Sequence, residues 1–463
     1  MAKAGHKVGR WSAFAARLAF LLIMSFALTA RPAAAQSILR DAETEALFAD
    51  MSRPLIEAAG LRPDNVDVVL IHDRSINAFV AGGQIVYIHS GLIAAADSAN
   101  EVQGVIAHEI GHITGGHIIR MQEGVKTATS ILILSMILGA AAMAAGAGEA
   151  GMGVLAAGQQ AAMGKFLAFS RTQESSADAA AAGFLARSQT NGKGLLTFFK
   201  KLQNQEFRYA IPQDNGYMRT HPLTGERLAA LEQTVKNAPG WNQATDARLE
   251  ARFQRVKAKL SGYVEEPERT LVLYPESNKS VPARYARAYA WHKRAYPEKA
   301  LAEAESLLAG DPNDPYFHEL KGQILLESGR PAAALESLRQ AVRHAPDQPL
   351  IAALLGHALI STEKPDNFEE AKKVLRAAIG RDNSNPFAWY QLGIVYDREG
   401  DTGRAALATA ERYNLQGEPR LALVNAEQAL KTVPTGTPDW LRAQDIAMVS
   451  RTEVERKKKN RDK

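Results

Sequence analysis

Residues 105–112 read VIAHEIGH, a short stretch that combines apolar residues with two histidines and one glutamate. The apolar residues at 105–107, together with Ile110, form one face of a helix and predict that the helix is buried. His108 and His112 are four residues apart, so both imidazoles project from the same side of that helix. A buried helix with two imidazoles at this spacing is typical of a metal site.

Glu109 directly follows the first of these histidines and indicates that the site is catalytic. A carboxylate in this position can take a proton from water and return it to the leaving amine of a peptide, while a zinc ion polarises the carbonyl. In a chain with 11 histidines, chance predicts only about 0.01 matches to the pattern. We therefore expect one Zn2+ per chain and metal-assisted peptide hydrolysis; two unrelated surface histidines are the alternative.

The type of the third ligand is restricted by composition. The chain has no cysteine, so imidazole and carboxylate must hold the metal. A third histidine six residues after the second would fall on Ile118, and His117 misses that place by one residue, so we expect His117 to be structural or exposed.

Glu174 is the better candidate for the third ligand. Asp178 lies one turn further on the same face, where it would orient a ligand histidine or protonate the leaving group; a solvated helix face is the alternative.

A later histidine, in the segment Thr220-His221-Pro222, is a further candidate. His221 would either stabilise an oxyanion or occupy the open metal position and keep the site latent. An ordinary loop residue is the alternative. Arg227 is expected to pair with Asp178.

A small sheet is expected before the metal-binding helix. Residues 66–71 have the composition of a strand, and 77–81 with 84–89 form a hairpin around Gly82 and Gly83. Helices are expected over three ranges: 38–60, 91–96 and 99–120.

Residues 128–164 are unusually apolar, and the first twenty of them are long enough to cross a membrane. His112 and Glu174 flank the segment, however, and must return to the same metal. The second half, interrupted by Glu149, is a poor second span. We expect a mobile or membrane-touching helical loop, and a transmembrane pair is the alternative.

The two ends of the chain carry an excess of basic residues. Residues 1–35 combine a basic start, an apolar run at 18–28 and small residues before a cut at Gln36, which predicts a secretory signal peptide, with an uncleaved anchor as the alternative. Residues 447–463 form a basic tail that we expect to be solvated and disordered. Removing the +5 of residues 1–35 and the +4 of residues 451–463 from the net charge of +5 leaves −4, so no nucleic-acid partner is expected.

The second half of the chain contains a repeat. Gly322 and Gly356 are 34 residues apart, as are Pro312 and Pro346, which is the period of tetratricopeptide repeats. We expect about four helix pairs over residues 279–446, joined by a linker at 263–278 to a metallopeptidase domain at 36–262. The predicted fold is mainly α: an α+β zincin-like domain with a small sheet, then an α-solenoid.

Taken together, residues 108–112, Glu174 with Asp178, and the hairpin that begins Asn77-Ala78-Phe79 resemble the glutamate-zincin metallopeptidases, the family that includes the CAAX prenyl proteases and HtpX. The resemblance implies zinc ligation by His108, His112 and Glu174. It also implies that Glu109 is the general base, and that the edge strand at residues 77–79 receives substrate as an added strand.

The signal peptide and the repeats resemble an exported branch of that family. This resemblance implies a periplasmic enzyme with peptidase and chaperone-like roles, acting on unfolded or stalled outer-membrane proteins. The repeats would then recruit clients or the outer-membrane assembly machinery. A mostly latent peptidase that acts chiefly as a chaperone or binding module is the alternative.

Overall fold

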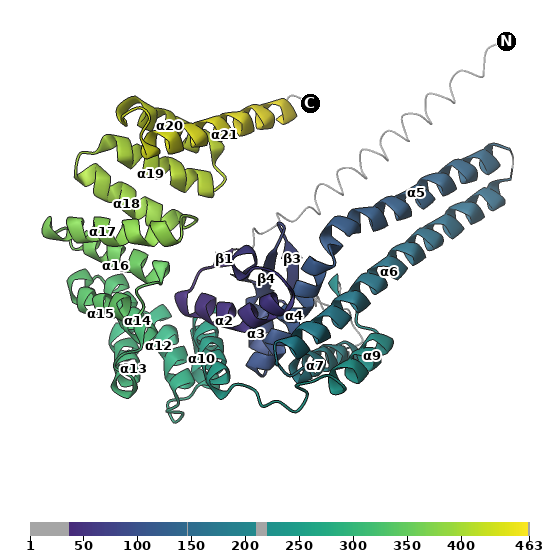
Figure 1. Cartoon of the computed structure of the whole chain (residues 1–463), viewed down its shortest axis with the longest axis horizontal. Helices are drawn as coiled ribbons and strands as arrows, with labels where there is room; N and C mark the ends of the chain where they lie inside the picture. Colours follow the sequence, from purple (N-terminus) through teal and green to yellow (C-terminus); the bar gives the residue numbers. More distant parts are fainter. Residues whose placement is uncertain (1–36, 146, 210–219, 462–463) are drawn as a thin grey trace, which may run out of the picture. The chain divides into compact units, whose positions relative to one another are not determined.

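The computed structural model of the chain describes residues 37–145, 147–209 and 220–461 (Figure 1). The predicted signal peptide at 1–35 lies outside these residues. A two-residue strand, β1 (Ile38–Leu39), precedes the first helix. The helices up to residue 264 are α2 (Ala42–Ala58), η1 (Pro63–Asn65), α3 (Ser90–Ala95), α4 (Ala99–Thr114), α5 (His117–Ala144), α6 (Gly148–Arg187), α7 (Lys193–Tyr209), α9 (Gly225–Lys236) and α10 (Ala247–Val264).

The sheet lies directly before the helix that carries residues 108–112. Strand β2 (Asp67–Ile71) pairs in parallel with β4 (Ile85–His89), and β3 (Ala78–Ala81) pairs antiparallel with β4 from the other side. Gly82 and Gly83 have φ values of 60° and 100°, which the tight turn between β3 and β4 requires. The predicted hairpin is therefore present, and β3 forms one edge of the sheet.

Helix α4 runs through the centre of the core that surrounds the sheet, and its residues from Ala99 to His112 are all buried. The Ser98 side chain accepts a hydrogen bond from the Glu101 backbone N–H and so caps its first turn. Gly111 allows α6 to approach, because a Cβ there would lie 2.8 Å from the Ala177 carbonyl oxygen. This contact places the helix of the HEIGH motif directly against the helix that carries Glu174.

The helix predicted over 99–120 is interrupted at Gly115 and Gly116. α4 ends at Thr114, and Gly116 takes a left-handed conformation with φ of 60° before α5 begins at His117. Two consecutive glycines end the first helix here and let the chain change direction.

The apolar segment 128–164, predicted to be a helical loop, forms part of a long hairpin of two helices. α5 and α6 contain 28 and 40 residues and run side by side (Figure 1). The far end of α6 carries Glu174 and Asp178 back to α4.

The rest of the chain is helical. Its helices are α11 (Pro267–Leu273), α12 (Val281–Lys293), α13 (Pro297–Gly310), α14 (Pro315–Glu327), α15 (Pro331–His344), α16 (Pro349–Ser361), α17 (Asp366–Arg381), α18 (Pro386–Arg398), α19 (Thr402–Leu415), α20 (Pro419–Thr432) and α21 (Pro438–Arg461). From α12 onward these make five successive pairs, one more than expected. α11 lies inside the predicted linker. The predicted disordered tail is instead part of α21 as far as residue 461.

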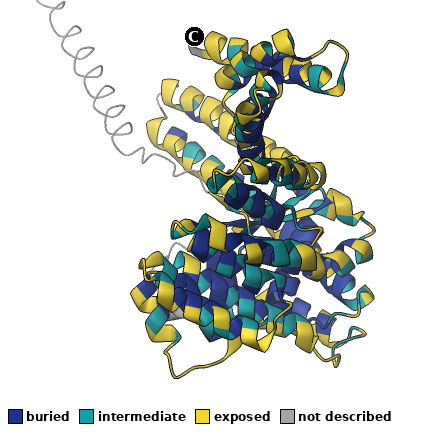
Figure 2. Ribbon diagram, turned by 90° about the vertical axis from the view of Figure 1, so that its left-hand side faces the viewer, coloured by how far each residue is buried: buried dark blue, intermediate teal, exposed yellow. Residues whose placement is uncertain are grey.

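The 34-residue period has a packing cause. A Cβ at Gly322 would lie 2.5 Å from the Leu338 side chain, and a Cβ at Gly356 would lie 2.5 Å from that of Leu375. In these two pairs, the first helix therefore needs a glycine where the second helix crosses it. Buried residues line the inner sides of the helices, and exposed residues cover their outer sides (Figure 2). The predicted fold class, mainly α with a small sheet and repeated helix pairs, is confirmed.

Candidate metal centre

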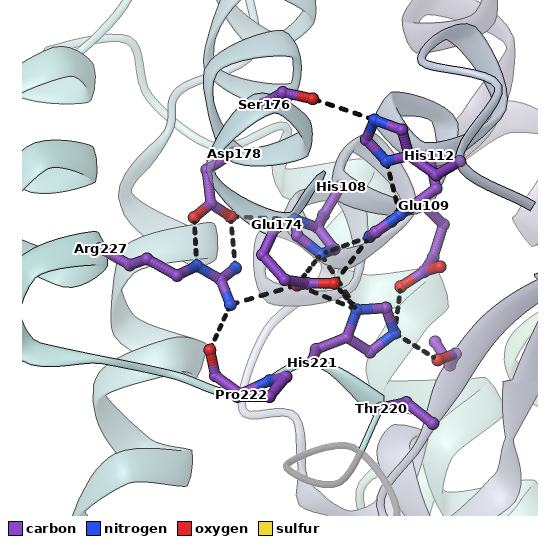
Figure 3. A network of polar contacts seen from close by, with 12 residues as sticks. His108, Glu109, His112, Glu174, Ser176, Asp178, Thr220, His221, Pro222 and Arg227 are labelled. Atoms are coloured by element: carbon purple, nitrogen blue, oxygen red, sulfur yellow. Dashed lines mark hydrogen bonds and ion pairs between the residues drawn. The ribbon is translucent and has the colours of Figure 1, made fainter. Parts of the chain in front are cut away.

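Four buried side chains from three separate segments converge at the centre of the N-terminal core (Figure 3). His108 and His112 come from α4, Glu174 comes from α6, and His221 lies in the segment that leads into α9. One ligand atom from each lies within 4.8 Å of the other three. All four residues were predicted from the sequence, in which they are spread over more than a hundred positions.

The separations of these atoms fit a small cation. Nε2 of His112 lies 3.1 Å from Nε2 of His108, which lies 3.4 Å from Oε2 of Glu174. Nδ1 of His221 lies 3.2 Å from each Glu174 oxygen and 3.3 Å from His108 Nε2. A four-coordinate ion with bonds of about 2.0–2.1 Å needs donor atoms about 3.3 Å apart. Imidazole and carboxylate donors at these distances can hold such an ion.

Glu109 lies beside the cluster with its carboxylate fully buried. Neither of its oxygens accepts a hydrogen bond from any residue that the structure describes. Oε1 lies 3.5 Å from His221 Nε2, and burial raises the pKa of the Glu109 carboxyl. A buried carboxylate without hydrogen bonds is costly, and a bound cation with its water would supply the missing partners.

Asp178 contacts the His108 ring at Nδ1, on the side away from the four converging donor atoms, and Arg227 contacts Asp178. Asp178 Oδ1 lies 3.0 Å from Nδ1 of His108, so the other ring nitrogen faces the cluster. Arg227 donates through Nε and Nη2 to the two Asp178 oxygens, at 2.8 and 2.9 Å. Its Nη1 donates to the Pro222 carbonyl at 2.6 Å and lies 3.1 Å from Glu174 Oε2. A planar guanidinium thus orients both carboxylates of α6.

The charges of the cluster are strongly coupled. Burial lowers the pKa of His108, but the carboxylates of Asp178 and Glu174 outweigh burial and raise it to about 10. Burial and the neighbouring His108 lower the pKa of His112 to about 2. Burial raises the pKa of the Glu174 and Asp178 carboxyl groups. At Glu174, His108 and His221 outweigh burial, and at Asp178, His108 and Arg227 do so. Both pKa values therefore lie below the usual range. Ionised carboxylates around imidazole are suited to bind a cation, which would take the place of the His108 proton.

His117 belongs to this network, so of the two predicted alternatives, a structural or an exposed residue, the exposed one is wrong. Its ring is buried, with Nδ1 only 2.9 Å from Nδ1 of His112 and Nε2 3.0 Å from Ser176 Oγ. The prediction assumed one continuous helix, which would turn His117 to another face. The glycines at 115 and 116 were the signal for the break that brings the two rings together.

The segment before α9 also contacts the edge strand of the sheet. His221 Nε2 lies 3.2 Å from the Ala78 carbonyl oxygen, and Thr220 Oγ1 donates to Asn77 Oδ1 at 3.3 Å. The Phe79 ring stacks on Tyr87, with centroids 5.1 Å apart. Residues 77–79 therefore lie next to the cluster, at the edge where a further strand can pair.

Comparisons with known proteins agree with this geometry. Residues 38–235 match the family model described as peptidase family M48, and residues 316–348 match that of the tetratricopeptide repeat. The beta-barrel assembly-enhancing protease of Yersinia pestis is 26% identical over 384 residues, which cover 81% of this chain and 76% of the relative. The protein of the same name from Escherichia coli K12 is 25% identical over 371 residues, covering 80% and 75% of the two chains.

A shorter relative matches the N-terminal region alone. The metalloprotease LoiP of Escherichia coli K12 is 31% identical over 180 residues, which cover 38% of this chain and 64% of LoiP. The family match includes α4, α6 and His221, and so contains the whole cluster. The match to peptidase family M48 is confined to residues 38–235, and the chain is a metalloprotease with tetratricopeptide repeats.

Proposed function

We propose that the metal is zinc, that His108, His112 and Glu174 hold it, and that Glu109 is the general base of peptide hydrolysis. The observation that carries this proposal is the buried Glu109 carboxylate, which lies beside the cluster and accepts no hydrogen bond from the described residues. Imidazole and carboxylate ligands in a four-coordinate arrangement are typical of zinc. Zinc bound there supplies Lewis acidity, which polarises a peptide carbonyl and lowers the pKa of water.

The protein's own groups then have distinct tasks. Glu109 accepts a proton from the attacking water and delivers it to the leaving amine. Asp178 holds His108 in the tautomer that directs Nε2 into the cluster, and Arg227 holds Asp178. These contacts favour an orienting role for Asp178 over the alternative of a proton donor.

His221 is proposed to keep the enzyme latent. Its Nδ1 lies as close to Glu174 and His108 as a fourth ligand does, so it stands where a substrate carbonyl must enter. Its other nitrogen contacts the Ala78 carbonyl on the edge strand. Withdrawal of this segment would open the metal and the strand edge together. The Asn77–Phe79 edge would then accept a substrate strand, and His221 would be free to stabilise an oxyanion.

Substrate class and location are proposed from the relatives and the predicted signal peptide. The relatives are named for the assembly of β-barrels, so we propose unfolded or stalled outer-membrane proteins as clients. An exported chain would meet them in the periplasm. We propose a peptidase domain at 36–262 and a repeat domain at 279–446 that recruits clients or the outer-membrane assembly machinery.

A second candidate function is that of a mostly latent peptidase acting as a chaperone for unfolded envelope proteins. The contacts of His221 with Glu174 and His108 favour it, because they occupy the cluster. Under this hypothesis, client binding is the main activity and hydrolysis follows only when the His221 segment moves.

A Glu109→Gln substitution tests the peptidase proposal. We expect at least a hundredfold loss of turnover of an unfolded outer-membrane protein, with metal content unchanged, because the general base is lost. Glu226→Gln, at an exposed carboxylate of α9, is the matched control. Undiminished turnover by the Glu109 variant would show that this mechanism is wrong. In the same assay, His221→Ala should raise turnover if the enzyme is latent and lower it if His221 mainly stabilises the oxyanion.

A further inference from the structure

The hairpin of α5 and α6 is packed in an unusual way. Away from the metal cluster, the buried residues of α5 are small: Gly124, Ser135 and Gly139. Gly151 and Ala162 are buried on the facing side of α6. A Cβ at Gly139 would lie 2.9 Å from the Gly151 carbonyl oxygen, so the two backbones are almost in contact. Close packing through small residues is how helices associate in a lipid bilayer.

The large apolar side chains of this hairpin point outward. Those exposed by more than a third on its distal half are Leu132, Ile133, Leu134, Met136, Ile137, Leu138, Met143, Met152, Met163 and Leu167. Six of them lie within 132–138, and successive residues turn by about 100° around a helix. They therefore cover every side of α5 that does not face α6. A hairpin built for water has the opposite arrangement, with large apolar residues between the helices.

Charge and length fit a bilayer as well. Between Lys126 on α5 and Lys165 on α6, the sequence contains a single charged residue, Glu149, near the tip. Lys126 and Ala145 are 19 positions apart, which corresponds to about 29 Å along a helix, close to the ~30 Å thickness of the hydrocarbon layer. α5 is the one helix among the described residues that is long and apolar enough to cross a membrane.

The base of the hairpin is basic. Arg120, Lys126, Lys165 and Arg171 are exposed there, against the single exposed acid Glu123. Exposed lysine and arginine side chains complement the anionic headgroups at a membrane surface.

We propose that the α5–α6 hairpin inserts into a lipid bilayer, with Lys126 and Lys165 at one headgroup layer and the tip near Glu149 at the other. Lipid is the occupant because the outward apolar residues surround α5, whereas a groove on a protein partner would cover one side. Spanning also places the backbone groups at the tip, where both helices end, in a polar layer rather than in hydrocarbon.

Insertion would position the candidate metal site, formed by His108, His112, Glu174 and His221, relative to the membrane. α6 continues without a break from the hairpin to Glu174, and the nine residues after Lys165 rise about 14 Å. α5 begins at His117, whose ring contacts His112. The proposed peptidase site would thus face polypeptides at the membrane surface, which extends the proposed function to the place where substrate is met.

A site-specific label tests the insertion directly. The chain has no cysteine, so Ile137→Cys can be labelled with an environment-sensitive NBD fluorophore, with Val424→Cys on α20 as the matched control. Ile137 and Val424 are 61% and 64% exposed. With vesicles of phosphatidylethanolamine and phosphatidylglycerol at 3:1, we expect a blue shift and a several-fold rise in emission at 137 alone. Nitroxide groups in the acyl chains should quench this emission, and iodide in the water should not.

Either of two results would overturn the proposal. One is a label at 137 that iodide still quenches in the presence of vesicles. The other is a label that responds to an unfolded barrel protein without lipid but not to vesicles, in which case the hairpin binds polypeptide instead.

Vesicle flotation provides a second measurement, on protein purified from the envelope after export. Leu134→Asp with Ile137→Asp should reduce the floating fraction at least tenfold in 0.5 M NaCl, because charges are excluded from hydrocarbon. Val272→Asp with Val424→Asp, at apolar residues outside the hairpin that are at least as exposed, should leave it unchanged. Equal flotation of the two double variants contradicts the proposal. Neither measurement depends on peptidase activity, so a failure here is distinct from a failure of the proposed reaction.

Discussion

The imidazole of His117 meets that of His112 through their Nδ1 atoms, 2.9 Å apart, while Nε2 of His112 faces the metal cluster. Burial lowers the pKa of His117, which favours its neutral form. A neutral ring can accept the Nδ1–H of His112 and donate its own Nε2–H to Ser176 Oγ, 3.0 Å away. The contact therefore selects the His112 tautomer in which Nε2 carries no proton and can serve as the proposed metal ligand.

Replacing His117 should weaken metal binding without unfolding the protein. We expect His117→Ala to lower the affinity for zinc by about 10–100-fold, because His112 loses the group that sets its tautomer. Competition with a chromogenic chelator measures this affinity directly. His344→Ala, at an exposed histidine of α15, is the control and should have no effect. Equal affinities for the two variants would mean that His117 is only a packing residue.

Arg227 is expected to hold Asp178 through its two parallel hydrogen bonds rather than through its positive charge alone. Arg227→Lys keeps the positive charge but cannot reproduce the two parallel hydrogen bonds to Asp178. We expect kcat to fall about tenfold or more, with little change in KM, because His108 is no longer held. Arg248→Lys, at an exposed site on α10, is the control. A change confined to KM would point to substrate binding instead.

Lys259 of α10 links the start of α2 to the first repeat helices. Its buried Nζ lies 2.5 Å from Asp41 Oδ2 and 3.4 Å from Glu43 Oε2, and Glu43 also accepts a hydrogen bond from Tyr285 of α12 at 2.7 Å. Removal of one partner from a buried pair typically costs about 3–5 kcal/mol. Lys259→Met should therefore lower the midpoint of urea unfolding clearly. Arg451→Met, which breaks an exposed pair with Glu427, should barely change it.

The same region should make stability depend on pH. Burial of Glu319 on α14 raises the pKa of its carboxyl to about 8, with the positive charge of Lys259 opposing this and the negative charges of Asp41 and Glu43 adding to it. Its Oε2 has no hydrogen-bond partner among the described residues. A carboxyl with a raised pKa favours the folded state at low pH. That contribution is complete below about pH 4.5 and is lost as the pH rises towards 8.

A Glu319→Gln variant should remove this dependence. Relative to the wild type, it should gain up to about 1.4 kcal/mol in free energy of unfolding for each pH unit between 4.5 and 8. Urea unfolding at pH 5 and pH 8 measures the difference. A constant offset between the two proteins at both values would show that Glu319 titrates normally in the folded state.

Much of the fold was predictable because the relevant patterns are local. The hairpin at residues 78–89 follows from β-branched residues around Gly82 and Gly83, and the repeats follow from glycines that recur where helices cross. The break between α4 and α5 was missed, because the apolar and polar pattern continues across Gly115 and Gly116. The helical tail after residue 447 was missed because its many charges resemble those of disordered ends. The domain limits stay predictions.

Spacing along one helix was enough to propose His108, Glu109 and His112, since residues four apart on a helix must share a face. The reaction type, the absence of thiolate ligands and the 34-residue repeat could therefore be inferred from the residues alone. Each of these depends on composition or on residues a fixed number of positions apart.

Which distant groups lie together depends on the packing of the helices. Glu174 and His221 reach the histidines of α4 across 62 and 109 residues from His112, and His117 turns towards His112 only because the chain bends between two helices. The packing of the helices also decides that the large apolar residues of α5 face outward. Such relationships depend on how whole helices pack against one another, and packing is set by the free energy of the entire core rather than by neighbours in the chain.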